Sequence, residues 1–429
     1  MASYSYKQIS ALGMSTLAFA ANFAVWTVFS IIGIRIKSEL GLNDTEFGLL
    51  VATPILTGSV MRLPLGILTD RYGGRIIYFI QMLLVAASTY GLSYATTYWQ
   101  FLAVGLLMGL AGASFAVGIA YTSAWFSKER QGTALGIFGA GNAGTAITNF
   151  VAPLILIAYG WRAVPKVYAE AMLVMALLFW FLTYDDPKHA ERKKTHHALT
   201  LAQRLRPLKD LRVWRFGLAY FFVFGGFVAL ALWLPKYYVS EYGLDLKTAA
   251  FITMLFTLPA GIIRAIGGWF SDKFGGRKVN WWVFWFAIVC LFFLSYPQTT
   301  VIIHGIKGDV SAHIGLSVRV FTFLVFALAV AMGFGMAGVY RCIADYYPAH
   351  MGVVGGLVGV IGGLGGFGLP ILFGAAADLI GVRSSCFMLL YGLAGMVMIW
   401  THYAIKAEQK AVQANKETLR AAMLHEETA

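Results

Sequence analysis

The chain has 429 residues, of which 59% are hydrophobic and only 12% are charged, and its mean hydropathy is +0.70. No soluble domain of this length has that balance, so the composition predicts a membrane protein with many spans. The formal net charge of +13 would suggest nucleic-acid binding in a soluble protein, but in a membrane protein basic cytoplasmic loops explain it better. We therefore expect no nucleic-acid partner.

Apolar runs of helical length predict twelve spans and an all-α membrane protein. The first run is long and continues directly into the fold, so it does not resemble a cleavable signal peptide. Three scattered cysteines, Cys290, Cys342 and Cys386, predict neither a disulfide framework nor a metal site. The expected spans cover residues 9–34, 47–68, 76–95, 99–125, 132–157, 166–183, 213–236, 248–270, 279–297, 317–341, 351–375 and 384–405.

Basic residues are distributed unevenly between the two sides that these spans define. The positive-inside rule places the richer side, with both termini and the central link, in the cytoplasm, and the chain in the cytoplasmic (inner) membrane. The richer side carries Arg71, Arg75, Lys128, Arg130, Lys188, Arg192, Lys193, Lys194, Arg204, Arg206, Lys209, Arg212, Lys273, Arg277 and Lys278. The poorer side carries Arg35, Lys37, Arg162, Lys236, Lys247, Lys307 and Arg383.

The central link divides the chain into two parts of similar length. We expect an N-terminal six-helix half at 1–184, a basic cytoplasmic linker at 185–212, a C-terminal six-helix half at 213–405 and a cytoplasmic tail at 406–429. The tail is polar and is expected to be helical in part. The segment from Gln298 to Gly315 is expected to be an external loop.

One sequence pattern occurs in both halves. Arg62 lies in an apolar run and Asp70 follows eight residues later, and Arg264 and Asp272 repeat this spacing at an offset of 202 residues (264 minus 62). Eight helical residues span roughly 12 Å, so an aspartate at the membrane surface places the arginine near the middle of a ~30 Å hydrocarbon core. A charge at that depth is costly and is functional by default. The repeat predicts one site built from both halves.

Several motifs make the prediction more specific. The loop at 70–75 and its repeat resemble the loop motif of the major facilitator superfamily over essentially the whole chain. The run Gly-Ala-Gly-Asn-Ala-Gly at 139–144, followed by Pro153, resembles the nitrate signature of the nitrate/nitrite porter family, and the run at 362–367 resembles its second copy. Arg62 and Arg264 match that family's two substrate arginines. The resemblance implies the major facilitator fold, with two pseudo-symmetric six-helix halves.

Anion binding is the function that we expect for the two arginines. The alternative is a pair of intramembrane ion bridges, but Glu170, Asp345 and Asp378 all fall near predicted span ends. The planar, forked donors of guanidinium suit planar oxyanions. Charge alone does not select the anion, since a divalent phosphate ester balances two arginines better than a monoanion does. The resemblance implies nitrate and nitrite.

Further substrate contacts follow from the resemblance. It implies that Asn142 donates to a substrate oxygen and that Tyr220 also contacts the substrate, although Asn142 alone would equally suit a helix–helix hydrogen bond and Tyr220 an aromatic lining. Phe115 and Phe224 are candidates to sandwich the planar ion, or are simply core residues. We assign rocking between states to a set of glycines and two aspartates, namely Gly139, Gly141, Gly144, Gly362, Gly363, Gly365, Gly366, Asp70 and Asp272.

The sequence predicts a secondary transporter of nitrate, and of nitrite, that works by alternating access as a monomer. No nucleotide-binding loop, catalytic motif, cofactor or metal site is expected. The length and the form of the signature resemble the proton-symporter subgroup, and on that resemblance we expect nitrate/proton symport. The two positive charges and the lack of a mid-membrane carboxylate or histidine favour the alternative, which is nitrate/nitrite exchange. An organic phosphate/phosphate exchanger is a more distant alternative, and an anion channel or sensor is an alternative of another class.

Overall fold

The computed structural model describes residues 5–186, 206–306, 308–347 and 351–427. Within these ranges twelve helices are long and apolar enough to cross a membrane, which confirms the number of spans predicted from the sequence. Each structural span overlaps the expected one. The basic residues predicted for the linker at 187–205, and Lys307 in the loop between spans nine and ten, lie outside the described residues.

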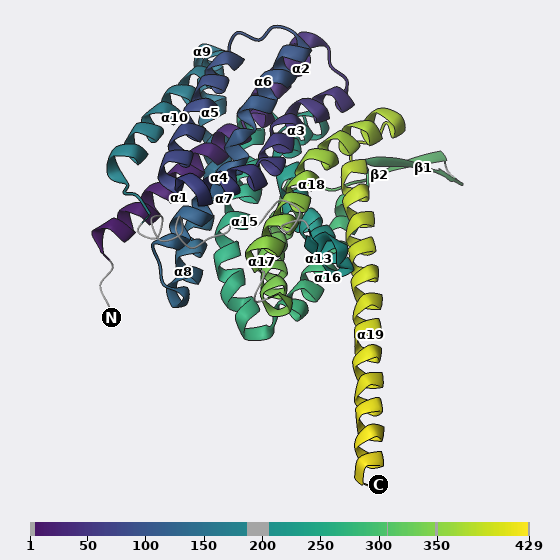
Figure 1. Cartoon of the computed structure of the whole chain (residues 1–429). Helices are drawn as coiled ribbons and strands as arrows, with labels where there is room; N and C mark the ends of the chain where they lie inside the picture. Colours follow the sequence, from purple (N-terminus) through teal and green to yellow (C-terminus); the bar gives the residue numbers. More distant parts are fainter. Residues whose placement is uncertain (1–4, 187–205, 307, 348–350, 428–429) are drawn as a thin grey trace.

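The first six spans form one half of the bundle, in which several spans are made of two or three helical segments (Figure 1). In chain order the segments are α1 (Tyr6–Trp26), α2 (Phe29–Leu40), α3 (Asp44–Val60), α4 (Arg62–Tyr72), α5 (Gly74–Leu92), α6 (Tyr98–Met108), α7 (Leu110–Ala124), α8 (Lys128–Gly139), the 3₁₀ turn η1 (Ala140–Ala143), α9 (Gly144–Tyr159) and α10 (Ala163–Leu182).

The last six spans form the other half. They comprise η2 (Arg206–Lys209), α13 (Leu211–Tyr220), the π-helical turn η3 (Phe221–Gly225), α14 (Gly226–Tyr242), α15 (Leu246–Phe274), α16 (Gly276–Leu294), α17 (Val318–Tyr346), α18 (Met351–Ile380) and α19 (Ser385–Glu427). Between α16 and α17 the strands β1 (Thr299–Gly305) and β2 (Gly308–Ile314) pair antiparallel.

The repeated sequence pattern produces the same helix end in both halves. After α4 the chain turns at Gly73 (φ 92°), and after α15 it turns at Gly275 (φ 84°), a left-handed region that glycine enters without steric cost. In each case the glycine N–H donates back into the last turn, to the carbonyls of Thr69 and Ser271. The next helix starts at the following glycine. The motif therefore encodes a tight helix–helix corner that is used twice.

The main contacts between the halves are those of α3 with α18, of α15 with α8, η1 and α9, and of α2 with α14. At the end of the bundle that faces away from both chain termini, which we call the distal end, the backbones approach closely (Figure 1). A Cβ at Gly48 would lie 2.3 Å from the Pro370 carbonyl oxygen, and one at Gly374 would lie 2.1 Å from that of Asp44. Only glycine fits at these positions, because any side chain would separate the halves.

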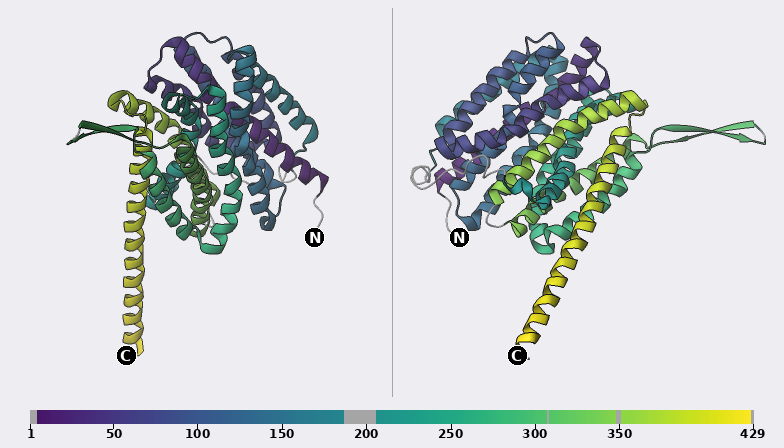
Figure 2. Two further views of the ribbon diagram at one scale, coloured as in Figure 1. Left: turned by 180° about the vertical axis from the view of Figure 1, so that it is seen from behind. Right: turned by 45° about the vertical axis from the view of Figure 1, so that its right-hand side comes forward.

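Two segments project from the bundle. The hairpin β1–β2, expected as an external loop, extends sideways from the distal end, with Thr299 opposite Ile314 at its base (Figure 2). The tail, expected to be helical in part, continues α19 as one helix as far as Glu427, well beyond the other helices (Figure 1).

Candidate functional site

Three spans depart from regular α-helix at or next to a predicted site residue. Span two breaks at Met61, and Arg62 is the first residue of α4. Span five tightens into η1, which contains Asn142. Span seven widens into η3 immediately after Tyr220. Such 3₁₀ and π segments are frequent at functional sites because they re-aim side chains and disturb the regular backbone ladder.

Arg62 lies in the interface between the halves. Its side chain is buried, and Nη1 donates a hydrogen bond of 2.8 Å to the carbonyl oxygen of Gly359 on α18, in the opposite half. Its guanidinium carbon lies 5.3 Å from the ring centroid of Phe115 and 5.4 Å from that of Phe224. Nε is buried and has no hydrogen-bond partner within the described part of the chain. Arg62 is therefore held between two aromatic rings, and its Nε–H group is an unpaired donor.

Arg264 approaches the same aromatic ring from the other half. It lies in the middle of the uninterrupted helix α15, and its guanidinium carbon is 5.6 Å from the Phe115 centroid. The ring centroid of Tyr340, on α17, is 5.7 Å from the same carbon. Nη1 of Arg264 is buried without a hydrogen-bond partner among the described residues. Two guanidinium groups, one from each half, thus meet at Phe115.

Tyr220 and Asn142 lie next to residues that contact this pair. The Tyr220 ring stacks on Phe224, with centroids 5.1 Å apart and planes 8° from parallel. Asn142 is buried, and the turn η1 packs against α15 at Gly261, where an added Cβ would be 3.6 Å from the Asn142 Cβ. Gly261 lies one helical turn before Arg264. The fold therefore brings together the residues that the sequence suggested for substrate contact.

The electrostatics of the centre are those of an anion receptor. Neither Arg62 nor Arg264 takes part in any ion pair among the described residues. Asp345, a potential partner by sequence, pairs instead with Arg341 at 3.2 Å. Buried positive charge with unpaired N–H donors is costly unless a ligand of opposite charge completes it. Planar oxyanions match both the charge and the donor geometry.

The predicted gating glycines do not form a single class. Gly141 and Gly144 face α1 in their own half, since a Cβ at Gly141 would be 2.4 Å from the Phe19 ring. Gly362 and Gly365 face span seven, also in their own half. Gly363 faces α3 across the interface, and a Cβ there would be 2.2 Å from the Ser59 hydroxyl oxygen. Gly366 lies between the halves, because its Cβ would be 2.8 Å from Val228 of α14 and 3.1 Å from Ile55 of α3. Gly139 differs from the expectation, because an added Cβ there meets nothing within 4 Å.

The two aspartates of the repeated motif lie at helix ends. Asp272, near the end of α15, accepts a hydrogen bond of 2.9 Å from Nη1 of Arg341 on α17. Asp70 occupies the corresponding place near the end of α4 and is exposed. Asp272 therefore ties two helices of its own half together.

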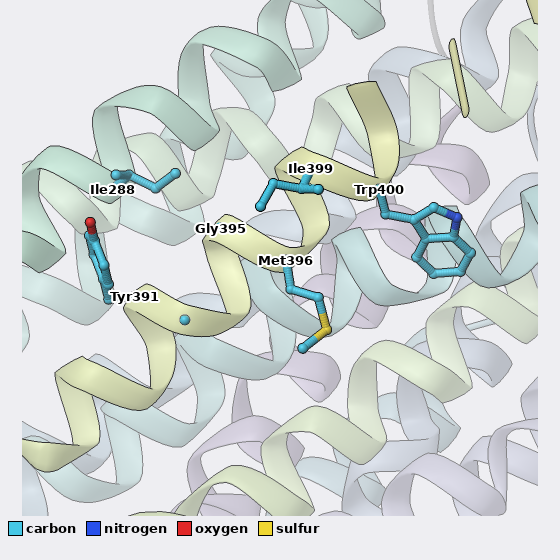
Figure 3. Close-up of a pocket in the computed structure, with 7 residues that line it drawn as sticks. Ile288, Tyr391, Gly395, Met396, Ile399 and Trp400 are labelled. Atoms are coloured by element: carbon cyan, nitrogen blue, oxygen red, sulfur yellow. The ribbon is translucent and has the colours of Figure 1, made fainter. Parts of the chain in front are cut away.

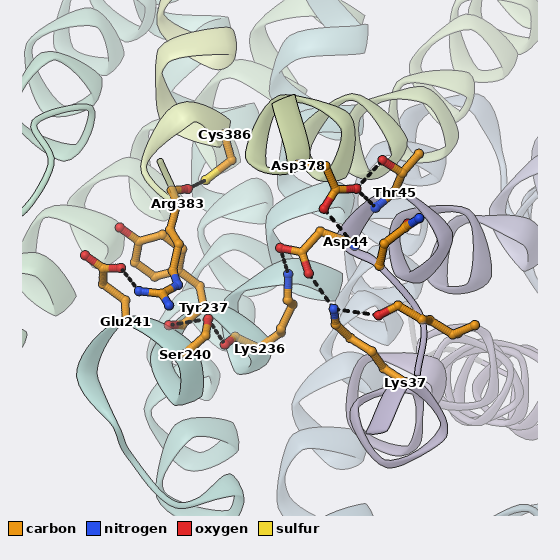
Figure 4. Close-up of polar contacts among 12 residues, drawn as sticks. Lys37, Asp44, Thr45, Lys236, Tyr237, Ser240, Glu241, Asp378, Arg383 and Cys386 are labelled. Atoms are coloured by element: carbon orange, nitrogen blue, oxygen red, sulfur yellow. Dashed lines mark hydrogen bonds and ion pairs between the residues drawn. The ribbon is translucent and has the colours of Figure 1, made fainter. Parts of the chain in front are cut away.

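A second polar cluster joins the halves at the distal end (Figure 4). We call it the distal cluster, and it consists of Lys37 and Asp44 from the N-terminal half and Lys236 and Asp378 from the C-terminal half. Asp44 binds both lysines, each at 2.5 Å. Asp378 accepts from the backbone N–H groups of Asp44 at 3.1 Å and Thr45 at 2.8 Å, which are free donors at the start of α3. The sequence analysis missed this cluster.

A shallow apolar groove lies elsewhere, between α16 and α19 (Figure 3). Its volume is about 510 Å³, and two glycines, Gly392 and Gly395, leave room for it. The surrounding side chains include Ile288, Tyr391, Met396, Ile399 and Trp400. It lacks charged lining residues and lies away from the interface of the halves, so it does not belong to the anion site.

Comparison with known proteins agrees with this architecture. The family model of the Major Facilitator Superfamily matches residues 14–368. The probable nitrate/nitrite antiporter NarK1 of Thermus thermophilus is 41% identical over 93% of this chain and 92% of its own length. The nitrite extrusion protein of Bacillus subtilis is 30% identical over 91% of this chain and 94% of its own.

Solved structures show the same fold. A bacterial homolog of the human lysosomal transporter Spinster, in an inward-facing and occupied conformation, superimposes with a TM-score of 0.64 at 17% identity, covering 92% of this chain and 93% of that one. Family model, relatives and fold all agree with the twelve apolar helices. The chain belongs to the nitrate/nitrite porter family of the major facilitator superfamily.

Proposed function

We propose that this protein carries nitrate, and also nitrite, across the cytoplasmic membrane by alternating access. One observation carries the proposal: two guanidinium groups from opposite halves meet on the Phe115 ring with buried N–H donors unpaired. Nitrate is flat and singly charged, so it can accept forked hydrogen bonds at its edge while aromatic rings cover its faces. The names of the Thermus and Bacillus relatives support the same substrates.

In this proposal Arg62 links anion binding to movement of the halves. Its Nη1 donates to the Gly359 carbonyl across the interface. An oxyanion is a better partner for the guanidinium than a carbonyl is, because it adds the attraction between opposite charges to the hydrogen bond. When the anion takes over this donor, α4 loses a bond to α18, and the central contact between the halves passes through the substrate instead.

In this proposal the distal cluster acts as a gate on the side of the anion site that faces away from the chain termini. The positive-inside rule makes the distal end external, so the Asp44–Lys236 ion pair and the Asp378 contact with α3 close the external path. Both contacts must break before an external anion reaches the arginines. Rocking of the halves about the centre exposes the site to each side in turn.

Two coupling modes are candidates. The length of the chain and the form of its signature support proton symport. Two uncompensated arginine charges oppose closure around an unoccupied centre, and they support obligatory exchange of nitrate for nitrite, as does the antiporter name of the Thermus relative. The Arg62 and Arg264 clamp serves either mode.

Purified protein in liposomes tests the function and separates the modes. Nitrate uptake is measured with internal nitrite, with an inward proton gradient, and with neither, using protein-free liposomes as control. Stimulation by internal nitrite alone supports exchange, and stimulation by the gradient alone supports symport. Uptake that an organic phosphate inhibits more strongly than nitrite does would overturn the substrate assignment. Uptake without counterflow of labelled nitrate would indicate a channel.

A further inference from the structure

We propose that Tyr340 is a positioning residue of the anion site, which fixes Arg264 and Tyr220 relative to α18. This inference rests on the proposed function. Tyr340 lies on α17, in span ten, and contacts residues of three other spans in its half.

The Tyr340 ring supports two site residues at once. One is Tyr220, whose ring meets it edge-on, with centroids 5.1 Å apart and planes at 76°. The other is Arg264, whose guanidinium carbon lies 5.7 Å from the Tyr340 centroid. A cation over an aromatic ring is attracted by the ring's electron-rich face. The same ring therefore restrains the cation on α15 and the phenol on span seven.

The hydroxyl of Tyr340 fixes the ring itself. It donates a hydrogen bond of 3.1 Å to the carbonyl oxygen of Gly355 on α18. One turn further along α18, a Cβ at Gly359 would lie 3.2 Å from the Tyr340 hydroxyl oxygen and 3.6 Å from Nη1 of Arg62. Tyr340 and Arg62 thus lie against the same glycine face of α18, one from each half.

This arrangement explains how a long, flexible arginine can present an ordered donor. Arg264 has no ion-pair partner among the described residues, and its Nη1 has no hydrogen bond there. Its orientation therefore depends on the rings of Phe115 and Tyr340. Without Tyr340 the guanidinium loses one of these two restraints, and an anion must order it on binding.

Three variants test the role of the ring and of its hydroxyl. Tyr340→Leu removes the ring, and we expect the nitrate Kd to rise by about tenfold, since a desolvated cation–π contact is lost. Tyr340→Phe keeps the ring and loses only the hydroxyl, so it should restore most of the affinity. Tyr346→Phe is the matched control, because Tyr346 also lies on α17 but its hydroxyl donates to Glu408 on α19, away from Arg62 and Arg264. Its nitrate Kd should equal that of the wild type.

Nitrate binding is measured by calorimetry on detergent-purified protein, alongside thermal unfolding without nitrate. A Leu variant with a wild-type Kd and a lowered Tm would overturn the inference, because Tyr340 would then only pack the bundle. A Phe variant as weak as the Leu variant would contradict the role of the ring.

Gly355→Ala provides an independent variant should the Leu protein fail to accumulate. Its Cβ would lie 3.3 Å from the Tyr340 ring and displace it without removing it. We expect a smaller rise in Kd, and an unchanged Kd would count against positioning. If the wild type itself binds no nitrate while folding normally, the proposed function fails. Binding that is unaffected by Tyr340 overturns only this inference.

Discussion

The two polar clusters between the halves differ in how their charges are satisfied. In the distal cluster two lysines face two aspartates, so the formal charges cancel, and Asp44 holds both lysines at 2.5 Å. At the centre Arg62 and Arg264 face aromatic rings, with no carboxylate paired to either among the described residues. A closed set of charges stabilises one arrangement of the helices. The central arginines have no opposite charge beside them, so they require a bound anion. This difference distinguishes a gate, which is the distal cluster, from a binding site, which is the centre.

The largest effect is expected from the arginines. Arg62→Lys and Arg264→Lys keep the charge but lose the planar fork. Losing charge-assisted hydrogen bonds to the anion costs roughly 3 kcal/mol, or about 100-fold in affinity, so nitrate uptake in liposomes should nearly vanish. Folded, monodisperse protein on size-exclusion chromatography is the control. Near-normal uptake in either variant would contradict the clamp.

Gly363 tests whether the centre must close against α3. Gly363→Leu places a side chain where even a Cβ would be 2.2 Å from the Ser59 hydroxyl oxygen, so the variant should insert but not turn over. Gly368→Leu is the matched control on the same helix, because nothing lies within 4 Å of its added Cβ. Counterflow of labelled nitrate measures turnover. Equal rates in the two variants would argue against closure at this glycine.

Asn142→Ala is expected to have an intermediate effect. Loss of a hydrogen bond to the anion should weaken nitrate binding by about 1–3 kcal/mol, with little change in thermal stability. Calorimetry and thermal unfolding together decide the role. A nitrate Kd equal to that of the wild type, together with a lowered Tm, would assign Asn142 to helix packing against α15.

The smallest effect is expected at the distal cluster, where two lysines bind one carboxylate but only one of them crosses the interface. Lys236→Met removes the contact between halves, whereas Lys37→Met removes a contact within one half. Lys236 is buried, but Asp44 is partly exposed and keeps Lys37 as its partner, so we expect loss of the pair to cost about 1 kcal/mol. External opening should therefore increase severalfold in Lys236→Met and remain unchanged in Lys37→Met.

The readout is labelling of Ser59→Cys by a membrane-impermeant thiol reagent added outside intact cells. Ser59 is buried in the interface of the halves, next to Gly363, and the three native cysteines are buried. Equal labelling in the two lysine variants would show that the Asp44–Lys236 pair does not hold the gate.

The sequence predicted features that depend on composition and spacing. The spans follow from apolar length, and the arginines were identified because charge inside a membrane is rare and because the pattern repeats. The distal cluster carries no such signal, since Asp44 and Lys236 are ordinary charges near span ends and meet only through helix packing. Tyr340 was missed for the same reason, as one aromatic among many.

The β-hairpin differs from the distal cluster and Tyr340, because its own sequence carries a pattern that could have predicted it. Its strands are rich in β-branched residues and alternate in polarity, with Val301, Ile303 and Val310 on one face and His304 and Asp309 on the other. That pattern, with glycines at the turn, is typical of a hairpin. The expectation for this segment is an external loop, and it does not include the two strands.

The most direct test of the difference between the central arginines and the distal cluster is a nitrate titration by calorimetry. It compares three proteins: the wild type, Arg62→Lys and Lys236→Met. We expect one nitrate bound per wild-type chain, binding lost in Arg62→Lys, and binding retained in Lys236→Met. Among the described residues, Arg62 and Arg264 each have a buried nitrogen with no partner, whereas both distal lysines are bound to Asp44. Loss of binding in Lys236→Met together with unchanged binding in Arg62→Lys would place the anion at the distal cluster and contradict the account.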